Sequence, residues 1–239
     1  MNILKKHSTF FLLLGVFIAA LFLRVYKLGV LPYGFHEDEV LSGYVGRFIL
    51  ETGKDIYGNR WPLLYFNKFG DYYIIAPMYL SGLATFVFGV TEFAVRFPTA
   101  LIGALTVFPL YFFTERIFKN KYIALLSCVV LAIMPWHVVM SRARAEGVLG
   151  AALMLTGLVW VINGIKSNKT VYFVLGGILL LGSYFTYHPY RILVPIALIP
   201  LLLFVSKKRL SMSVSIVTLI ILCTGITGYI SSTEWGKGR

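Results

Sequence analysis

The stretch YYIIAPMYLSGLATFVFGV, residues 72–90, decides the topology of this chain. It carries no charged residue, and its length approaches the about 20 apolar residues that cross a bilayer. Pro77 interrupts the run, which is compatible with a broken or interfacial helix. Every loop after residue 90 changes sides according to whether this stretch crosses the membrane, so the rest of the sequence has to decide the question.

The composition is that of an integral membrane protein. Of the 239 residues, 58% are hydrophobic and only 13% are charged, and the mean hydropathy is +0.80; soluble domains average about 25% charged residues. Cys128 and Cys223 lie in apolar segments, which argues against a structural disulfide. The net charge of +12 would suggest nucleic acid in a soluble protein, but here it reports membrane topology, and no nucleic-acid partner is expected.

Seven other apolar segments are predicted to span the membrane, and together they define a single membrane domain over residues 1–239. Lys5 and Lys6 precede the first of them, as in a signal peptide, but no A-x-A cleavage site follows, so this segment is expected to remain as an anchor. The predicted spans are residues 9–26, 99–113, 122–140, 148–165, 171–186, 192–205 and 211–230.

The distribution of lysine and arginine argues that residues 72–90 do not cross the membrane. Cations in short loops favour the cytoplasmic side. If the stretch crosses, the short loops on the two sides hold equal numbers of cations and the bias disappears. If it does not cross, all acidic residues except Glu115 lie outside, and the cytoplasmic side holds Lys5, Lys6, Arg116, Lys119, Lys121, Lys166, Lys169, Lys207, Lys208 and Arg209.

The predicted fold is therefore an all-α integral membrane bundle with a large first external loop, residues 27–98. Residues 37–52 and 72–90 are expected to form interfacial helices within that loop. Two short external loops follow, at residues 141–147 and 187–191. The sequence contains no phosphate-binding glycine loop and no zinc-ligand spacing.

Three consecutive acids open the first interfacial helix and are candidates for a catalytic base. Glu37, Asp38 and Glu39 precede apolar residues at helical spacing, and Gly53 marks the predicted helix end. Acids also stabilise helix N-termini, but that role is worth only about 0.3–1 kcal/mol for each acid. A carboxylate about 3 Å from an acceptor hydroxyl can remove its proton. A helical wheel places Glu39 away from the apolar face and Asp38 at its edge, which does not decide between them.

Cations on the external side are candidates for binding a phosphate. Lys68 precedes the second interfacial helix, where it could bind a lipid phosphate or extend to the interface. Arg142 and Arg144 run against the positive-inside trend, and guanidinium groups pair well with phosphate oxygens, although anionic lipid head groups would serve equally. Glu146, at the start of a span, is either a helix N-terminal acid or a second active-site carboxylate.

The third external loop adds aromatic and basic residues to the same face. His188, with Arg191 close by, could orient a phosphate or a sugar hydroxyl, and Tyr187 and Tyr190 could stack on a sugar ring or belong to an interfacial belt. Acids and cations on one face suit a reaction with a lipid-phosphate leaving group, whose developing charge the cations would stabilise. No resident cofactor is predicted, and whether a divalent cation also binds the acids stays open.

In their order and spacing these motifs resemble the GT-C glycosyltransferases of family 39 type, which include protein mannosyltransferases and aminoarabinose transferases. The resemblance extends from residue 24 to about residue 191. It rests on the proline, glycine and acids of residues 32–39, on Gly58 and Pro62, and on residues 51–55, 76–79, 88–98, 135–137 and 141–142.

The resemblance implies an enzyme that transfers a sugar, with inversion, from a polyprenyl-phosphate donor to an acceptor on the non-cytoplasmic face. It implies that Asp38, the first acid of the Asp38–Glu39 pair, is the base. It also implies that Lys68 is the lysine before the juxtamembrane helix and that Glu146 is the later acid at the start of a span.

Two departures from the family pattern bear on these expectations. His36 and Glu37 precede the acidic pair, so the choice among Glu37, Asp38 and Glu39 stays open. Such enzymes usually carry further spans and often a C-terminal domain, so the chain is expected to be the N-terminal part of a larger module. The expected location is the plasma membrane of a bacterium or an archaeon, with the active site on the external face.

Two other functions compete with the transferase. A transporter or flippase for a lipid-linked sugar would place polar groups near the bilayer midplane, and the predicted spans hold almost none there. A truncated, non-catalytic membrane subunit is the second alternative. Membrane lipids are expected partners, and the resemblance implies a polyprenyl-phosphate sugar as donor. The identity of the sugar stays open, as does whether the acceptor is a protein, a lipid or a glycan.

Overall fold

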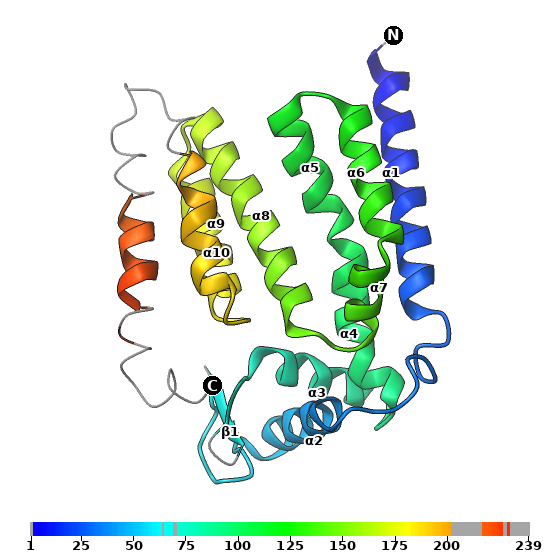
Figure 1. The fold of residues 1–239 in the computed structure, drawn as a ribbon, viewed down its shortest axis with the longest axis vertical. Coiled ribbons are helices and arrows are strands. Elements are labelled where there is room, and N and C mark those ends of the chain that lie inside the picture. The colour runs from blue at the N-terminus through cyan, green and yellow to red at the C-terminus, as the bar shows by residue number, and fades with distance from the viewer. Residues whose placement is uncertain (1, 64, 69–70, 202–216, 227–228, 230–239) are drawn as a thin grey trace.

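The structure consists of a bundle of helices that share one axis direction and of a layer of elements that lies across one end of the bundle (Figure 1). The computed structural model describes residues 2–63, 65–68, 71–201, 217–226 and 229. The aligned helices are α1 (Asn2–Val25), α4 (Glu92–Leu105), α5 (Val107–Phe118), α6 (Lys121–Ile133), α7 (Pro135–Arg142), α8 (Glu146–Ser167), α9 (Thr170–Tyr184) and α10 (Tyr190–Leu198). The layer contains α2 (Glu37–Thr52), the strands β1 (Tyr65–Lys68) and β2 (Asp71–Ile74), and α3 (Ala76–Phe88).

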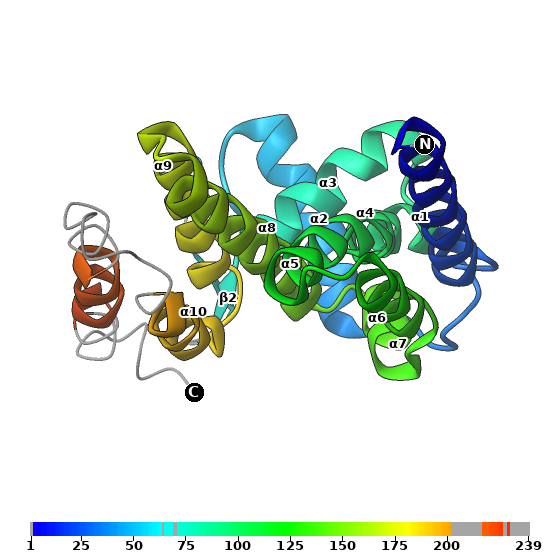
Figure 2. The same ribbon diagram turned by 90° about the horizontal axis from the view of Figure 1, so that it is seen from above.

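The aligned helices form two groups that meet at α8. Seen along the helices, α8, α5 and α4 lie between α1, α6 and α7 on one side and α9 and α10 on the other (Figure 2). Separate apolar clusters fill the two groups, one centred on Ala20, Ala104 and Cys128 and the other on Leu158, Leu180 and Tyr184. A third cluster, around Val45 and Met78, holds α2 against α3 and the hairpin.

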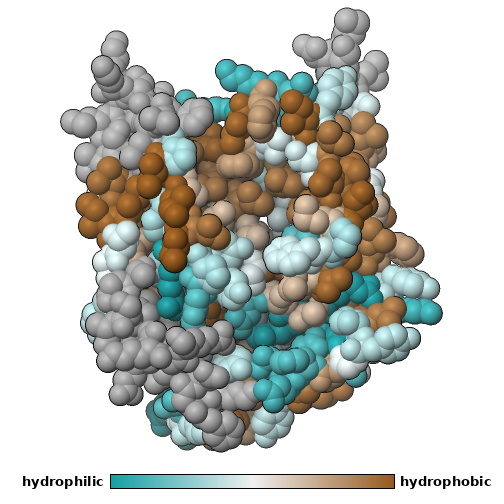
Figure 3. Space-filling view, viewed as in Figure 1, coloured by the Kyte–Doolittle hydropathy of each residue, from teal (hydrophilic) through white to brown (hydrophobic). Residues whose placement is uncertain are grey.

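Apolar side chains also cover the outside of the helices. Phe10 and Phe22 on α1, Leu126 on α6 and Ile178 on α9 each expose more than half of their surface. Figure 3 shows this hydrophobic surface over the middle of the helices, and hydrophilic residues gathered at the end that carries the layer. A soluble protein rarely exposes apolar surface on this scale, and a lipid environment accounts for it.

Among the residues that the structure describes, three helical segments are long and apolar enough to cross a membrane: Ser8–Val25, Glu92–Phe118 and Glu146–Ser167. A fourth arises if the pair Lys121–Ile133 and Pro135–Arg142, bent by 54°, is a single broken span. Shorter apolar helices at Ala76–Phe88, Thr170–Tyr184 and Val217–Ile226 complete the set found in the described residues. The prediction of an all-α membrane protein is confirmed, whereas the number of seven spans stays a prediction, because residues 202–216 and 230 lie outside the described chain.

The structure differs from the expected element boundaries in three places. The apolar segment expected to begin at residue 99 begins at Glu92, because the helix continues through Pro98, and it is interrupted at Thr106. The segment 122–140 is broken at Pro135, whose ring prevents a straight continuation. Residues 72–74 lie in β2 rather than in a helix, and α3 begins only at Ala76, with Pro77 in its first turn.

Residues 26–91 leave the aligned helices and return to them at the same end. The last turn of α1 and the first turn of α4 both lie beside the layer (Figure 1). Arg96 on α4 donates hydrogen bonds to the carbonyls of Leu28 and Pro32, which follow α1. Helix α3 lies across the end of the bundle and does not run along it (Figure 1). Residues 26–91 can therefore connect α1 to α4 at one end of the bundle without crossing to the other end.

The crossing of α2 over α3 depends on two glycines. A Cβ atom at Gly46 would overlap the carbonyl group of Met78, and one at Gly82 would overlap the backbone of Gly46. Gly46→Ala is therefore expected to lower the free energy of unfolding by about 3 kcal/mol, because backbone atoms cannot move aside as a side chain can. Thermal unfolding in mild detergent measures the effect. Gly177→Ala, where a Cβ meets nothing within 4 Å, is the matched control; an equal loss in both variants would contradict the close crossing.

Candidate active site

A cavity of about 800 Å³ opens where the layer meets the ends of the aligned helices. Its wall is built from the start of α2, from β2, from α7, from the α7–α8 connection and from the α9–α10 connection. Six residues that the sequence singled out from three different external loops line it together: Asp38, Glu39, Arg144, Glu146, Tyr187 and Tyr190.

The first turn of α2 places Asp38 on the cavity wall. His36 is the N-cap of the helix, and its Nδ1 accepts a hydrogen bond from the backbone N–H of Asp38 at 3.3 Å. The same nitrogen lies 3.5 Å from a carboxylate oxygen of Asp38, whose side chain is about one-third exposed. Glu37 is exposed and is not part of the cavity wall. Among the three acids, Asp38 is thus both accessible and directed to the cavity.

Glu39 is held in an ion pair that the helical wheel did not anticipate. Its two carboxylate oxygens accept hydrogen bonds from Nε and Nη2 of Arg96 at 2.8 and 2.9 Å, and both side chains are buried. The backbone N–H of His36 donates to the same carboxylate at 3.1 Å, which completes a capping box. The helical wheel places Glu39 away from the apolar face of α2, but the side chain is buried against Arg96 of α4, and its engaged oxygens make it a poorer base than Asp38.

Arg144 is a buried cation on the wall of the same cavity. It lies between α7 and α8 in a left-handed backbone conformation (φ 54°), which is uncommon for residues other than glycine. Its side chain is 4% exposed, and Nη1 lies 3.8 Å from a carboxylate oxygen of Glu146. Within the described residues, its Nε and Nη2 have no hydrogen-bond acceptor.

Electrostatics keep this guanidinium charged although it is buried. Burial lowers the pKa of Arg144, while the nearby carboxylates of Glu146, Asp38 and Glu39 raise it. Because an arginine starts from a pKa far above neutrality, the group remains a cation. A buried cation with two N–H groups that lack an acceptor is suited to bind an anion that enters the cavity.

Two tyrosines, one in the α9–α10 connection and one at the first residue of α10, form an aromatic part of the wall. The ring centroids of Tyr187 and Tyr190 lie 6.2 Å apart. The hydroxyl of Tyr190 donates to the carbonyl of Gly147 at 2.8 Å, which ties this connection to the start of α8. Burial raises the pKa of Tyr190 to about 12, so its hydroxyl stays protonated and keeps that hydrogen bond.

The structure places three predicted site residues away from the cavity wall, and a fourth is not described. Arg142 does not line the cavity, because its guanidinium donates to the carbonyls of Leu23, Arg24, Tyr26 and Leu31 and so closes the C-terminal end of α1. That contact replaces the expected role in phosphate binding. His188 in the α9–α10 connection and Arg191 in the first turn of α10 are not among the residues that line the cavity. Lys68 ends β1, and its side chain lies outside the described part of the structure.

Arg96 and His137 are residues of this region that the sequence left without a role. An arginine in the apolar run of residues 92–105 was a signal that a buried carboxylate partner exists, but nothing in the sequence pointed to Glu39. His137 lines the cavity from α7. The part of the chain that the structure describes contains no group of three or more His, Cys, Asp or Glu side chains that could hold a metal ion.

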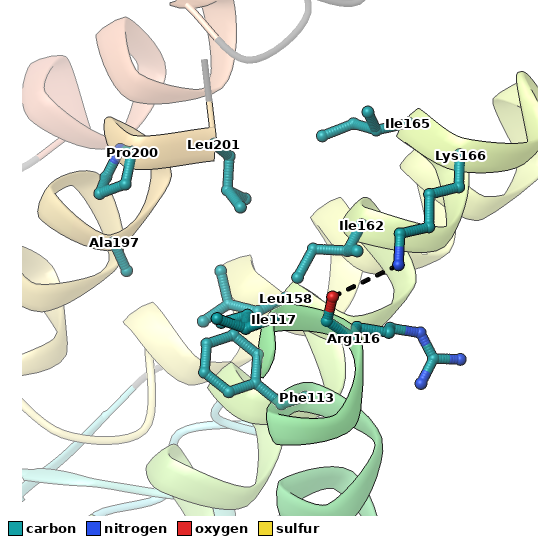
Figure 4. A pocket seen from close by; sticks show the side chains of 10 residues that line it. All are labelled: Phe113, Arg116, Ile117, Leu158, Ile162, Ile165, Lys166, Ala197, Pro200 and Leu201. Atoms are coloured by element: carbon teal, nitrogen blue, oxygen red, sulfur yellow. Dashed lines mark hydrogen bonds between the residues drawn. The ribbon is translucent and has the colours of Figure 1, made fainter. Parts of the chain in front are cut away.

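A second cavity, of about 400 Å³, lies towards the opposite end of the bundle (Figure 4). Its wall is mainly apolar, with Arg116 and Lys166 at its edge, and Nζ of Lys166 donates to the backbone carbonyl of Arg116 at 3.5 Å. No described residue that lines it is acidic. Asp38, Glu39 and Glu146 line the first cavity, and Glu51 and Glu92 line a further cavity of about 500 Å³.

Comparison with known proteins identifies the family. The sequence model of the family described as dolichyl-phosphate-mannose-protein mannosyltransferase matches residues 75–229, which is more than half of the chain. The chain belongs to this family. It is a membrane protein of the GT-C glycosyltransferase type, and its family uses a polyprenyl-phosphate-linked sugar as donor. The match includes Arg144, Glu146 and Tyr187 but begins after Asp38, so the role of Asp38 rests on the geometry of the cavity.

Proposed function

We propose that this protein is an inverting glycosyltransferase that moves a sugar from polyprenyl phosphate to an acceptor on the non-cytoplasmic side of the membrane. The observation that carries the proposal is the shared cavity of Asp38 and Arg144, an accessible carboxylate and a buried cation from segments more than 100 residues apart. The family supports the class of donor, and the cavity supports the assignment of roles.

The proposed reaction is a single displacement at the anomeric carbon. Asp38 takes the proton of the acceptor hydroxyl, and the acceptor oxygen forms a bond to the anomeric carbon. The bond between that carbon and the phosphate oxygen breaks, and its electron pair stays on the phosphate. Arg144 stabilises the negative charge that develops there. One displacement inverts the configuration of the anomeric carbon.

The distribution of cations supports the proposed membrane side. The turn from α5 to α6 and the turn from α8 to α9 lie at the end of the bundle opposite to the layer (Figure 1). Arg116 and Lys166 are in the last turns of α5 and α8, and Lys119 and Lys169 follow in these connections. Short loops rich in lysine and arginine favour the cytoplasm. The cavity end, with Asp38 and Glu146, then faces away from it.

Release of polyprenyl phosphate tests the proposed function. Purified protein in lipid nanodiscs is incubated with a radiolabelled polyprenyl-phosphate sugar and candidate peptide, lipid and glycan acceptors, with and without a chelator. We expect sugar transfer to an acceptor and an inverted anomeric configuration in the product. Movement of intact donor across liposomes without bond cleavage would support the transporter alternative, and neither activity would support a non-catalytic subunit.

Arg144→Gln is expected to reduce the transfer rate about 10²-fold, because the departing phosphate loses its buried cation. Arg144→Lys is expected to restore part of the rate, since it keeps the charge without the guanidinium fork. Steady-state kinetics measure both variants. Lys169→Gln, an exposed cation at the other end of the molecule, is the control; an equal loss of rate in this variant would contradict a specific role for Arg144.

A further inference from the structure

His137 is a buried histidine on the wall of the candidate site. The proposed reaction assigns it no role, and its sequence context indicates none. It is the third residue of α7 and is 6% exposed. Its side chain lines the same cavity as Asp38 and Arg144. Of its two ring nitrogens, Nδ1 faces a protein partner and Nε2 faces none among the described residues.

Arg24 reaches this histidine from the last turn of α1. Its side chain is fully buried, and its guanidinium donates to the carbonyls of Ala20 at 2.9 Å, Ala132 at 3.1 Å and Leu131 at 3.2 Å. In a continuous helix the carbonyl of Leu131 would accept from residue 135, but proline has no N–H. The break between α6 and α7 thus provides an acceptor that helps to hold Arg24 in place.

The contact between Arg24 and His137 determines the tautomer of the ring. Nη2 of Arg24 lies 2.9 Å from Nδ1 of His137. A guanidinium can only donate hydrogen bonds, so Nδ1 must be the bare, accepting nitrogen. The hydroxyl of Ser141, 3.3 Å from the same nitrogen, donates its proton to the backbone carbonyl of His137 at 2.6 Å. The imidazole is therefore neutral, and its proton is on Nε2.

The Nε2 atom is buried and has no hydrogen-bond partner among the described residues. Leaving a buried donor without an acceptor costs about 1–3 kcal/mol, which a bound ligand would recover. Nε and Nη2 of Arg144, a residue that lines the same cavity, are likewise buried and have no acceptor among the described residues. Donors without acceptors on two residues that line one cavity indicate a ligand with several acceptor oxygens.

We propose that Nε2–H of His137 donates a hydrogen bond to a phosphate oxygen of the polyprenyl-phosphate donor, and that Arg24 is the positioning residue that fixes the donating tautomer. The inference rests on the proposed function and deepens it, because it adds a neutral donor to the cation Arg144 in the same phosphate site. The Arg24 charge behind the ring polarises Nε2–H and strengthens it as a donor to an anion.

Two substitutions at His137 separate its ring nitrogens. In His137→Asn, the amide oxygen can take the place of Nδ1 and accept from Arg24, but no group reaches the position of Nε2. In His137→Gln, the longer side chain can place its NH₂ group near the position of Nε2. We expect His137→Asn to weaken the binding of undecaprenyl phosphate about 10- to 100-fold, the usual value of a hydrogen bond to a charged group, and His137→Gln to retain most of the affinity.

Binding is measured on the full chain in nanodiscs with undecaprenyl phosphate, with the neutral alcohol undecaprenol, and with a glycosylated donor. Thermal unfolding of each variant identifies any general loss of folding. Equal affinity of the wild type and His137→Asn overturns the inference, as does equal weakening in His137→Gln and His137→Asn. A loss seen only with the glycosylated donor shows a contact to the sugar and overturns the phosphate assignment. A wild type that binds none of the phosphates overturns the proposed function, and the inference with it.

A spectroscopic measurement tests the tautomer without any ligand. Nitrogen-15 shifts of histidine distinguish a protonated ring nitrogen from a bare one, and His137→Gln identifies the His137 signals. We expect a protonated Nε2 and a bare Nδ1 in the wild type, and a change of the Nε2 signal when undecaprenyl phosphate is added. A protonated Nδ1 overturns the inference even if the protein is an active transferase.

Discussion

Asp38→Asn is expected to lower the rate of sugar transfer by about 10²–10⁴-fold, the usual contribution of a general base. The amide has the shape of the carboxylate but cannot take a proton from the acceptor hydroxyl. Because the Asp38 side chain is about one-third exposed and lies on the cavity wall, we expect its replacement to leave the fold unchanged. We therefore expect the loss to appear in kcat, with little change in the binding of undecaprenyl phosphate.

Glu37→Gln is the matched control for this prediction. Glu37 precedes Asp38 in the same turn of α2 but is exposed and does not line the cavity. Single-turnover transfer from a labelled donor should be close to the wild-type rate in this variant. An active Asp38→Asn protein together with an inactive Glu37→Gln protein would move the base to the neighbouring residue, and two active variants would remove the first turn of α2 from the chemistry.

The sequence predicted those features that depend on residues close together in the chain. The apolar spacing and Gly53 predict a helix over residues 37–52, and α2 runs from Glu37 to Thr52 with Gly53 in the left-handed conformation. The membrane class follows from composition. The convergence of Asp38 with Arg144 and Glu146 could be anticipated only as a shared membrane face, because side-chain placement within that face depends on how the loops fold.

The rest depends on long-range pairs, which one sequence does not reveal. Glu39 is buried because Arg96, 57 residues further on, approaches it, and a helical wheel considers only the neighbours within one helix. Arg142 and Arg144 look alike in sequence, yet one closes the end of α1 and the other faces the cavity. The β1–β2 hairpin was missed because its strands are only four residues each and run into the apolar stretch that contains α3.

Glu39→Ala is expected to lower the free energy of unfolding by about 3–5 kcal/mol, because it leaves Arg96 buried without its main counter-charge. Arg96 is fully buried and forms two short hydrogen bonds to Glu39. Its remaining acceptors are Glu92 at 3.3 Å and backbone carbonyls. Unfolding of the purified protein in mild detergent, monitored by circular dichroism against denaturant, measures the loss.

Glu92→Gln is the control on the other carboxylate of the same arginine. Its side chain is 42% exposed, so water screens the pair, and we expect a loss of less than about 1 kcal/mol. The double variant Glu39→Leu with Arg96→Met replaces the pair by apolar side chains and is expected to recover stability relative to Glu39→Ala. Equal losses in Glu39→Ala and Glu92→Gln would contradict a dominant buried pair.

The buried pair also fixes the first turn of α2, which carries Asp38. Glu39→Ala should therefore also reduce the rate of sugar transfer, because it changes the position of Asp38. An apolar double variant that recovers stability but not activity would show that the ion pair aligns the base.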